Sequence, residues 1–260
     1  MFEPGGGESR SGILTAVILA GGRGTRIEHL LPGRPKAMAP VNGRPFLEWS
    51  LRYLAWNGID RIVLSTGHLA EVVERHFKRN PLPGVELLFA REDFPLGTAG
   101  GFLHAAGAVA RRPGPWLVAN GDSLLLADLA AFVARFRAGN WAGAVLGLNS
   151  SDASRYGTIE MGSAGRLLKF SEKRPGAGLV NAGIYLFSDP TLAQFPQKTP
   201  LSFETEVFPF LLDRGAEILV HRVEAPFLDI GTPASLAEAG EFVRRHLQPL
   251  LEKPAAGLRT

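Results

Sequence analysis

Short apolar runs alternate with amphipathic stretches through the first half of the chain. This pattern predicts buried strands joined by helices that cross over a parallel sheet, because such a sheet is covered on both faces. The expected strands span residues 14–19, 61–66, 85–90 and 116–119. The expected helices span residues 45–57, 69–77, 99–108 and 126–138. This half therefore indicates an α/β fold.

Beyond residue 141 the strand-like segments come closer together. They span residues 142–148, 157–161, 167–171 and 180–186, and the turn at 162–166 predicts a hairpin. A helix over 202–213, a strand over 217–222 and a closing helix over 233–246 complete the expected elements. We expect a flexible arm over 1–12, one domain over 13–247 with halves 13–141 and 142–247, and a loosely held tail over 248–260. No segment repeats at a fixed period, which excludes a solenoid.

Composition narrows the class of protein. The chain has 28 Lys and Arg residues against 25 Asp and Glu residues and no long basic run, so nucleic-acid binding is not indicated. No apolar stretch predicts a membrane-spanning helix or a signal peptide. With no cysteine, disulfides are excluded and a cytoplasmic location is expected. The 31 Gly and 19 Pro residues are scattered at segment ends and predict many shaped loops, where binding sites concentrate.

A glycine-rich segment follows the first expected strand and contains Gly21, Gly22, Arg23, Gly24 and Arg26. Glycines let backbone N–H groups approach an anion closely, and two guanidinium groups suit the charge of a triphosphate. The chain has no Gly-Lys pair of the kind a Walker loop needs, and Ile27 stands where a dinucleotide fingerprint needs glycine. A tight turn without any ligand is the alternative explanation.

Together with a second motif, this loop resembles the signature of the sugar-1-phosphate nucleotidylyltransferases. The two segments are Leu19-Ala20-Gly21-Gly22-Arg23-Gly24-Thr25-Arg26 and Arg34-Pro35-Lys36. The resemblance extends over residues 13–246 and implies a Rossmann-like, mixed and mostly parallel sheet flanked by helices, with a small β-rich sugar-binding portion. It implies that Arg26 and Lys36 are catalytic and that the nucleotide is bound by Leu19, Ala20, Gly21, Gly22, Arg23, Gly24 and Thr25.

A third motif follows the third expected strand. Taken alone, Gly97 and Thr98 would form a helix N-terminus with Thr98 as its cap. The resemblance implies instead that both residues approach the nucleobase and that Glu92 reads its edge. A carboxylate only accepts hydrogen bonds, which matches the adjacent N1–H and amino donors of guanine and mismatches the mixed edge of uracil or thymine. GTP is therefore the expected nucleotide, with the neighbouring Asp93 as a competitor for the role.

Two aspartates end apolar segments that lie far apart in the chain. Asp122 follows the fourth expected strand, and Asp229 follows a late apolar stretch. Each could be only a turn residue or a helix cap. The resemblance counts Asp122 among the catalytic residues and pairs the two aspartates as ligands of one Mg²⁺. This ion typically takes one or two carboxylates and fills its other positions with substrate phosphates and water.

Four residues match the sugar side of the family. The resemblance implies that Gly157 contacts the sugar, that Glu172 accepts from its hydroxyls and that Asn181 binds a diol. It gives Lys173 the sugar phosphate and a catalytic role. A solvated Glu-Lys pair on the surface is the alternative for residues 172 and 173.

The implied reaction joins an NTP to a sugar 1-phosphate and releases pyrophosphate. The closest likeness runs through residues 38–48 and Arg155-Tyr156-Gly157-Thr158 and is to the heptose 1-phosphate guanylyltransferases, which supply GDP-heptose for bacterial surface polysaccharides. Alternatives are a mannose 1-phosphate guanylyltransferase and an N-acetylmuramate 1-phosphate uridylyltransferase. Outside this class stand a non-catalytic nucleotide-sugar sensor and a dinucleotide-dependent oxidoreductase, which would leave Arg23, Arg26 and the aspartate pair unused. The expected partners are thus small molecules, with neither nucleic acid nor membrane insertion, and a homodimer is compatible with the sequence.

Overall fold

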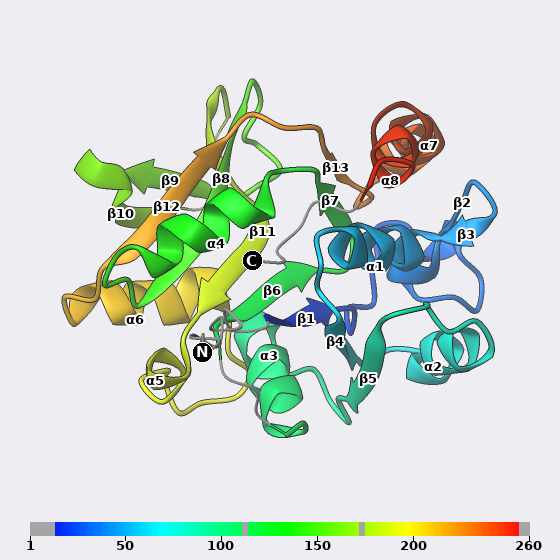
Figure 1. Cartoon of the computed structure of the whole chain (residues 1–260), viewed down its shortest axis with the longest axis horizontal. Helices are drawn as coiled ribbons and strands as arrows, with labels where there is room; N and C mark the ends of the chain where they lie inside the picture. Colours follow the sequence, from blue (N-terminus) through cyan, green and yellow to red (C-terminus); the bar gives the residue numbers. More distant parts are fainter. Residues whose placement is uncertain (1–13, 111–113, 172–174, 255–260) are drawn as a thin grey trace, which may run out of the picture.

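The computed structural model describes residues 14–110, 114–171 and 175–254 (Figure 1). Its strands are β1 Thr15–Leu19, β2 Pro40–Val41, β3 Arg44–Pro45, β4 Arg61–Thr66, β5 Glu86–Arg91, β6 Trp116–Asn120, β7 Ser123–Leu125, β8 Gly143–Ser150, β9 Thr158–Met161, β10 Leu167–Ser171, β11 Gly178–Phe187, β12 Ile218–Val223 and β13 Phe227–Asp229. Its α-helices are α1 Phe46–Trp56, α2 Ala70–Arg79, α3 Thr98–Gly107, α4 Leu129–Arg137, α5 Asp189–Leu192, α6 Phe208–Asp213, α7 Pro233–Phe242 and α8 Gln248–Leu251.

A mixed sheet of nine strands forms the centre of the molecule. Its main path runs β10-β9-β11-β6-β1-β4-β5, and β8 pairs with both β11 and β12. The four strands β6, β1, β4 and β5 are mutually parallel, whereas β11 runs antiparallel to β6 and β8. The expected α/β class and the hairpin, here β9 and β10, are confirmed. Among the described helices, none has both the length and the apolar composition that a bilayer span requires.

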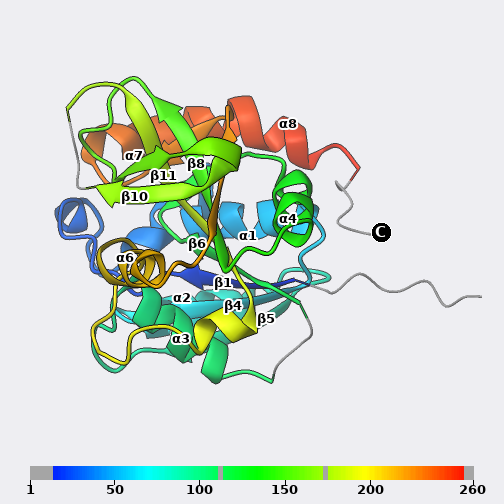
Figure 2. The same cartoon turned by 90° about the vertical axis from the view of Figure 1, so that its left-hand side faces the viewer.

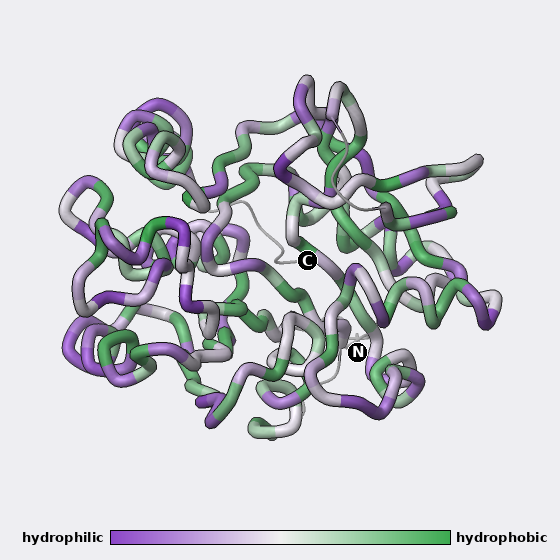
Figure 3. The backbone as a smooth tube through the Cα atoms, turned by 180° about the vertical axis from the view of Figure 1, so that it is seen from behind, coloured by the Kyte–Doolittle hydropathy of each residue, from purple (hydrophilic) through white to green (hydrophobic). Residues whose placement is uncertain are grey.

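Alternating side chains on β1 explain why both faces of the sheet carry helices. Ala16 and Ile18 belong to a core cluster that includes α1, α2, α4 and α7, whereas Val17 belongs to a second cluster built on α3 and α6. Figure 2 shows α3 and α4 on opposite sides of β1 and β6. Hydrophobic residues accordingly concentrate on the central strands and hydrophilic residues on the outer loops (Figure 3). The continuous apolar run at the start of the chain is thus a strand covered on both faces.

Several elements differ from the sequence expectation, including the short strands β2, β3 and β13 and the short helix α5, which were not expected. The expected helix over 202–213 begins as a π-helical turn, Phe203–Val207, before α6. The closing helix, expected to end at residue 246, continues through a second π-helical turn into α8 (Gln248–Leu251) because Leu247 is fully buried and Leu250 and Leu251 pack on the core. Strand β7 was not expected, and it pairs antiparallel with β13. The expected N-terminal arm lies outside the described residues.

A buried carboxylate joins α1 to α2. Glu48 is 4% exposed, and its Oε1 accepts from Arg44 Nη1 at 2.5 Å and from Arg52 Nε at 2.9 Å. Its Oε2 lies 3.4 Å from His76 Nε2 on α2. Burial raises the pKa of Glu48, but the hydrogen bonds from Arg52, Arg44 and His76 outweigh burial, and the pKa of this carboxyl lies below its ordinary value.

Replacing Glu48 with glutamine removes the negative charge that faces these arginines and should destabilise the fold by about 2 kcal/mol at pH 7. The loss stays below that of a fully buried ion pair because the arginines are partly solvated and water replaces part of their lost partner. A carboxyl whose folded pKa is depressed stabilises the fold above its unfolded pKa, and this contribution disappears as the pH falls through the folded pKa. Urea unfolding should thus separate Glu48→Gln from the wild type at pH 7, and the difference should shrink once the pH falls below the ordinary glutamate pKa of about 4.3. Glu74→Gln, which breaks the exposed pair with Lys78, is the matched control. Equal separation at both pH values would contradict the ionic origin of the effect.

Candidate active site

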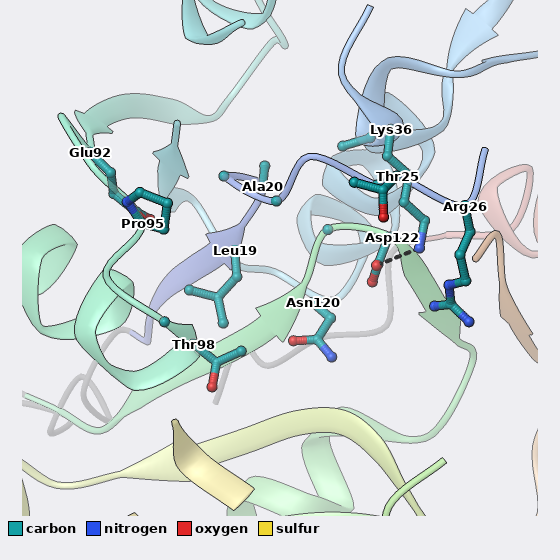
Figure 4. Close-up of a pocket in the computed structure, with 16 residues that line it drawn as sticks. Leu19, Ala20, Thr25, Arg26, Lys36, Glu92, Pro95, Thr98, Asn120 and Asp122 are labelled. Atoms are coloured by element: carbon teal, nitrogen blue, oxygen red, sulfur yellow. Dashed lines mark hydrogen bonds and ion pairs between the residues drawn. The ribbon is translucent and has the colours of Figure 1, made fainter. Parts of the chain in front are cut away.

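A cavity of about 450 Å³ opens at the carboxyl ends of the parallel strands. Its walls come from the loop after β1, the turn that carries Lys36, the segment after β5 and the end of β6 (Figure 4). The lining residues are Leu19, Ala20, Gly21, Gly22, Gly24, Thr25, Arg26, Lys36, Ala37, Glu92, Pro95, Gly97, Thr98, Asn120, Gly121 and Asp122. The structure thus brings most of the nucleotide residues expected from the sequence into one cavity, at the sheet edge where α/β proteins bind ligands.

The three glycines of the first loop meet different constraints. Gly24 has a φ of +65°, and a Cβ there would lie 2.6 Å from the Cβ of Lys36, so the backbone turn and the packing of Lys36 both require glycine. At Gly21 a Cβ would stand 3.0 Å from Glu92 Oε1. A Cβ on Gly22 would meet no atom within 4 Å, and this residue lines the cavity. A tight turn therefore explains Gly24 and leaves Gly22 facing open space.

Lys36 and Asp122 form an ion pair in the cavity wall. Lys36 Nζ donates to Asp122 Oδ2 at 2.7 Å, and the lysine side chain is 9% exposed while that of Asp122 is 38% exposed (Figure 4). The 3₁₀ turn Lys36–Met38 begins directly after Pro35, whose extended backbone directs the chain into it. Asp122 accordingly has a specific charged partner, which a simple turn aspartate would lack.

Asp229 reaches the same place from the other end of the chain. Strand β13 pairs with β7 so that Asp229 stands opposite Ser123, and Ile230 N donates to the Asp122 carbonyl at 3.0 Å. A Cβ on Gly231 would lie 2.5 Å from Asp229 Oδ1, 3.0 Å from Arg26 Nη2 and 3.2 Å from Lys36 Nζ. Two cations and the second aspartate therefore converge at Gly231, beside the Lys36–Asp122 pair.

Of the two simpler roles considered for Asp229, the structure shows that of a turn residue and not that of a helix cap. Asp229 Oδ1 accepts from Gly231 N at 2.9 Å, which is a local turn contact. The cap of α7 is Thr232, which forms a capping box with Ser235, so Asp229 is not a helix cap. Its Oδ1 also accepts from Arg155 Nη2 at 3.0 Å. Asp229 thus combines a turn contact with an ion pair.

Glu92 stands at the other end of the cavity in a fixed orientation. Ser65 Oγ donates to Oε1 at 2.7 Å and Leu96 N donates to Oε2 at 3.2 Å. A Cβ on Gly101 would lie 2.6 Å from Oε1, so the glycine makes room for the carboxylate. Each carboxylate oxygen has two lone pairs, and one on each oxygen stays available for a ligand donor.

Thr98 does not cap α3. The cap position belongs to Gly97, whose φ is +79° and where no side-chain cap bond forms. The Thr98 hydroxyl accepts from Phe203 N at 3.0 Å and donates to Glu204 Oε2 at 3.3 Å. The helix-cap alternative for Thr98 is therefore wrong, and its hydroxyl ties the base-side loop to the π-helical turn before α6.

Gly157 and Asn181, the sugar-side residues within the described part of the chain, lie outside the cavity lining. Asn181 N donates to the Gly157 carbonyl at 2.9 Å, which places the two residues side by side. Asn181 Nδ2 donates to the Tyr185 hydroxyl at 2.7 Å and to Glu204 Oε1 at 3.3 Å, and its Oδ1 accepts from Gly183 N at 2.9 Å. One acceptor lone pair of Asn181 remains for a sugar hydroxyl. Glu172 and Lys173 lie outside the described residues.

Arg23 is the one residue of the expected loop that points elsewhere. Its side chain is 65% exposed, lies 3.5 Å from Glu28 Oε1 and does not line the cavity. The structure therefore brings Arg26 and Lys36 to the aspartates but leaves Arg23 on the surface.

Sequence reasoning gave no role to two charged residues beside this site. Glu204 accepts from Tyr185, Asn181, Thr98 and Ser202, and burial followed by the Glu204 charge raises the pKa of Tyr185 well above its usual value, so the tyrosine hydroxyl stays a donor. No motif marks Glu204. Arg155 precedes Tyr156-Gly157, and that position is the signal that could have found it.

Comparisons with known proteins agree with this geometry. The profile of a family described as "Nucleotidyl transferase" matches residues 15–246. Mannose-1-phosphate guanylyltransferase of Mycobacterium tuberculosis is 34% identical over 238 residues, which cover 90% of this chain and 66% of that protein. D-glycero-alpha-D-manno-heptose 1-phosphate guanylyltransferase of Campylobacter jejuni is 32% identical over 224 residues, which cover 85% of this chain and 96% of that protein. The crystal structure of HddC from Yersinia pseudotuberculosis complexed with GMP-PN superposes with a TM-score of 0.76 at 28% identity, covering 87% of this chain and 98% of that one.

Proposed function

The chain belongs to the nucleotidyl transferase family, and on this basis we propose that it transfers the guanylyl group of GTP to a sugar 1-phosphate, with D-glycero-α-D-manno-heptose 1-phosphate as the preferred acceptor. The observation that carries the proposal is the cavity itself. Arg26, Lys36 and the aspartate pair gather at one end and Glu92 stands at the other. A guanine at Glu92 would direct its phosphates towards the charged end.

The choice of guanine rests on Glu92 and on the relatives. The carboxylate is held by Ser65 and Leu96 and retains acceptor capacity on both oxygens, which suits the N1–H and amino donors of guanine. The mycobacterial and Campylobacter relatives are both guanylyltransferases by name, and HddC was crystallised with GMP-PN. Asp93, the competitor for the role, is exposed and does not line the cavity.

The aspartate pair fits Mg²⁺ as the metal of this site. Asp122, directly before β7, and Asp229, at the end of β13, supply hard oxygen donors. Lys36 Nζ links them, because it contacts Asp122 and stands beside Gly231 together with Asp229. The described residues contain no group of three or more metal-binding side chains. Two carboxylates match an ion that keeps water and substrate phosphates as its other ligands. When bound, Mg²⁺ would supply positive charge to the phosphates of both substrates.

In the proposed reaction an anionic oxygen of the sugar 1-phosphate attacks the α-phosphorus of GTP. The bond from that phosphorus to the bridging oxygen of the β-phosphate breaks, and pyrophosphate leaves with the electron pair. Because the nucleophile is already ionised, no general base is needed. The obstacle is repulsion between the substrates, about 3 kcal/mol for each pair of unit charges about 5 Å apart at an effective dielectric of about 20. Arg26 and Lys36 offset this repulsion and hold the phosphates in line.

We prefer heptose 1-phosphate to mannose 1-phosphate as the acceptor because the chain covers more of the length of the heptose 1-phosphate enzyme. The chain spans 96% of the Campylobacter heptose 1-phosphate enzyme and just under two thirds, 66%, of the mycobacterial mannose 1-phosphate enzyme. The identities of 32% and 34% do not separate the two sugars, so mannose 1-phosphate is the second candidate.

A matrix of nucleotides and sugars tests the proposal directly. The enzyme is mixed with Mg²⁺, each of GTP, UTP, dTTP and ATP, and heptose, mannose, glucose or N-acetylmuramate 1-phosphate, and pyrophosphate is measured. We expect the highest kcat/KM for GTP with the heptose. A maximum with mannose would replace the acceptor, and a maximum with UTP and N-acetylmuramate 1-phosphate would replace both substrates. No pyrophosphate with any pair would leave a sensor as the better description.

The two glycines of the first loop give a matched pair of variants. Gly22→Ala should leave the thermal unfolding temperature unchanged and raise KM for GTP about tenfold, because its new methyl group meets no protein atom but enters the cavity. Gly24→Ala should instead lower stability by about 1 kcal/mol or more, since a positive φ and the Lys36 contact oppose a side chain. Thermal unfolding and GTP titration separate the two effects. A loss of stability in Gly22→Ala with unchanged KM would return the loop to a purely structural role.

A further inference from the structure

Arg155 lies on the loop between β8 and β9 and reaches the proposed metal ligand Asp229. Its Nη2 lies 3.0 Å from Asp229 Oδ1, and the arginine and aspartate side chains are 36% and 17% exposed. The guanidinium also lies over the ring of Tyr156, 5.5 Å from its centroid, and Tyr156 packs edge-on against Phe227 of β13. The contact of Arg155 with the Tyr156 ring, and of that ring with Phe227 on β13, therefore keeps the arginine beside Asp229.

Arg155 belongs to the same cluster as Arg26 and Lys36, because the Asp229 oxygen that it contacts stands beside Gly231, next to both of those cations. Burial and then the Asp229 charge raise the pKa of Tyr156, whereas the Arg155 and Arg26 charges lower it and the Asp122 charge raises it. These groups therefore lie close enough to act on one hydroxyl. The described part of the cluster holds three cations, Arg26, Lys36 and Arg155, against two carboxylates.

The contact with Asp229 leaves Arg155 incompletely satisfied. A guanidinium carries five N–H donors, and Arg155 Nε is buried without a hydrogen-bond partner in the described part of the chain. An unpaired buried donor costs free energy, so this position of the side chain is one that a better acceptor can displace. A phosphate offers such an acceptor, because it can take two parallel hydrogen bonds from one guanidinium.

The position of Arg155 determines which substrate meets it. Tyr156 and Gly157 follow it directly, and Gly157 is joined to Asn181 on the sugar side. Glu92 and the nucleobase end belong to the cavity that Arg155 does not line. The phosphate nearest to Arg155 is therefore that of the sugar, in the arrangement proposed above.

We propose that Arg155 exchanges partners during turnover, holding Asp229 when the site is empty and binding the phosphate of the sugar 1-phosphate when substrates enter. This inference rests on the proposed function for the identity of the substrate. It also has a consequence that needs no substrate. While the guanidinium sits on Asp229, it opposes the binding of a divalent cation to that carboxylate, so removing the arginine charge should strengthen cation binding.

Calorimetric titration of the substrate-free protein with Mn²⁺ tests whether Arg155 holds Asp229 in the empty site. Arg155→Gln should bind Mn²⁺ about tenfold more tightly than the wild type, because one positive charge beside the ligand is gone. Arg155→Lys keeps the charge and should bind Mn²⁺ as the wild type does. Arg166→Gln is the matched control, since Arg166 pairs with Glu217 on the surface, away from this cluster. Equal Mn²⁺ affinity in Arg155→Gln and the wild type would overturn the exchange.

Steady-state kinetics test whether Arg155 binds the phosphate of the sugar 1-phosphate during turnover. In Arg155→Gln, KM for the sugar 1-phosphate should rise about thirtyfold while KM for GTP changes less than about twofold. Arg155→Lys should raise KM for the sugar 1-phosphate by an intermediate factor, because an ammonium lacks the paired donors of a guanidinium. A parallel rise in both KM values would assign Arg155 a structural role and overturn the proposal, and a thermal unfolding curve of each variant accompanies the kinetics. If the wild type makes no pyrophosphate at all, the proposed function fails, whereas the Mn²⁺ titration still decides the role of Arg155 at Asp229.

Discussion

Asp122→Asn should lower kcat by about a thousandfold or more and leave the fold in place. The asparagine has nearly the same shape and keeps an oxygen that can accept from Lys36 Nζ, which now lies 2.7 Å from the carboxylate. What it loses is one negative charge at the point where Lys36, Arg26 and Asp229 converge. Without that charge the site would hold a divalent cation poorly, and the positive charge that offsets the repulsion between the substrate phosphates would be lost with the cation. Pyrophosphate release measures the loss, and thermal unfolding measures the fold.

Asp213→Asn provides the control for this prediction. Asp213 is exposed at the end of α6, away from the cavity. Its variant should keep wild-type kcat. If Asp122→Asn retained more than about a tenth of the activity, the aspartate pair would not be the metal site and the charge-neutralising mechanism would lose its centre.

Glu92→Gln should lower the ratio of kcat/KM for GTP to kcat/KM for UTP by about a hundredfold. The amide would place a donor where guanine also presents donors, which leaves buried groups unpaired. The same amide, which carries N–H donors and a carbonyl acceptor, suits the mixed edge of uracil. Ser65 can serve as acceptor as well as donor, so the hydrogen bond to residue 92 survives the change.

Asp93→Asn is the matched variant for the base. Asp93 is adjacent in sequence, exposed and outside the cavity lining, so its amide should leave the ratio unchanged. A shift in Asp93→Asn and none in Glu92→Gln would transfer base recognition to Asp93.

Local pattern alone predicted most of the elements. The continuous apolar run of β1 and that of β4, whose bounds of Arg61–Thr66 agree with the expected strand, follow from side-chain chemistry over a few residues. The family resemblance, confirmed by the profile match, rests on the same kind of local signal, a strand followed directly by Gly21, Gly22 and Gly24.

Tertiary structure decided which charges meet. Asp122 and Asp229 are more than a hundred residues apart, and the three-residue strands β7 and β13 that join them are too short to leave a clear pattern. Arg23 and Arg26 look equivalent in the loop, yet only Arg26 reaches Gly231 while Arg23 pairs with Glu28. Arg155 and Glu204 gain their roles only from partners distant in sequence. Elements form from propensities that act over one or two turns, whereas a site of opposed charges depends on long-range strand pairing, and the chain order alone does not encode that in any short segment.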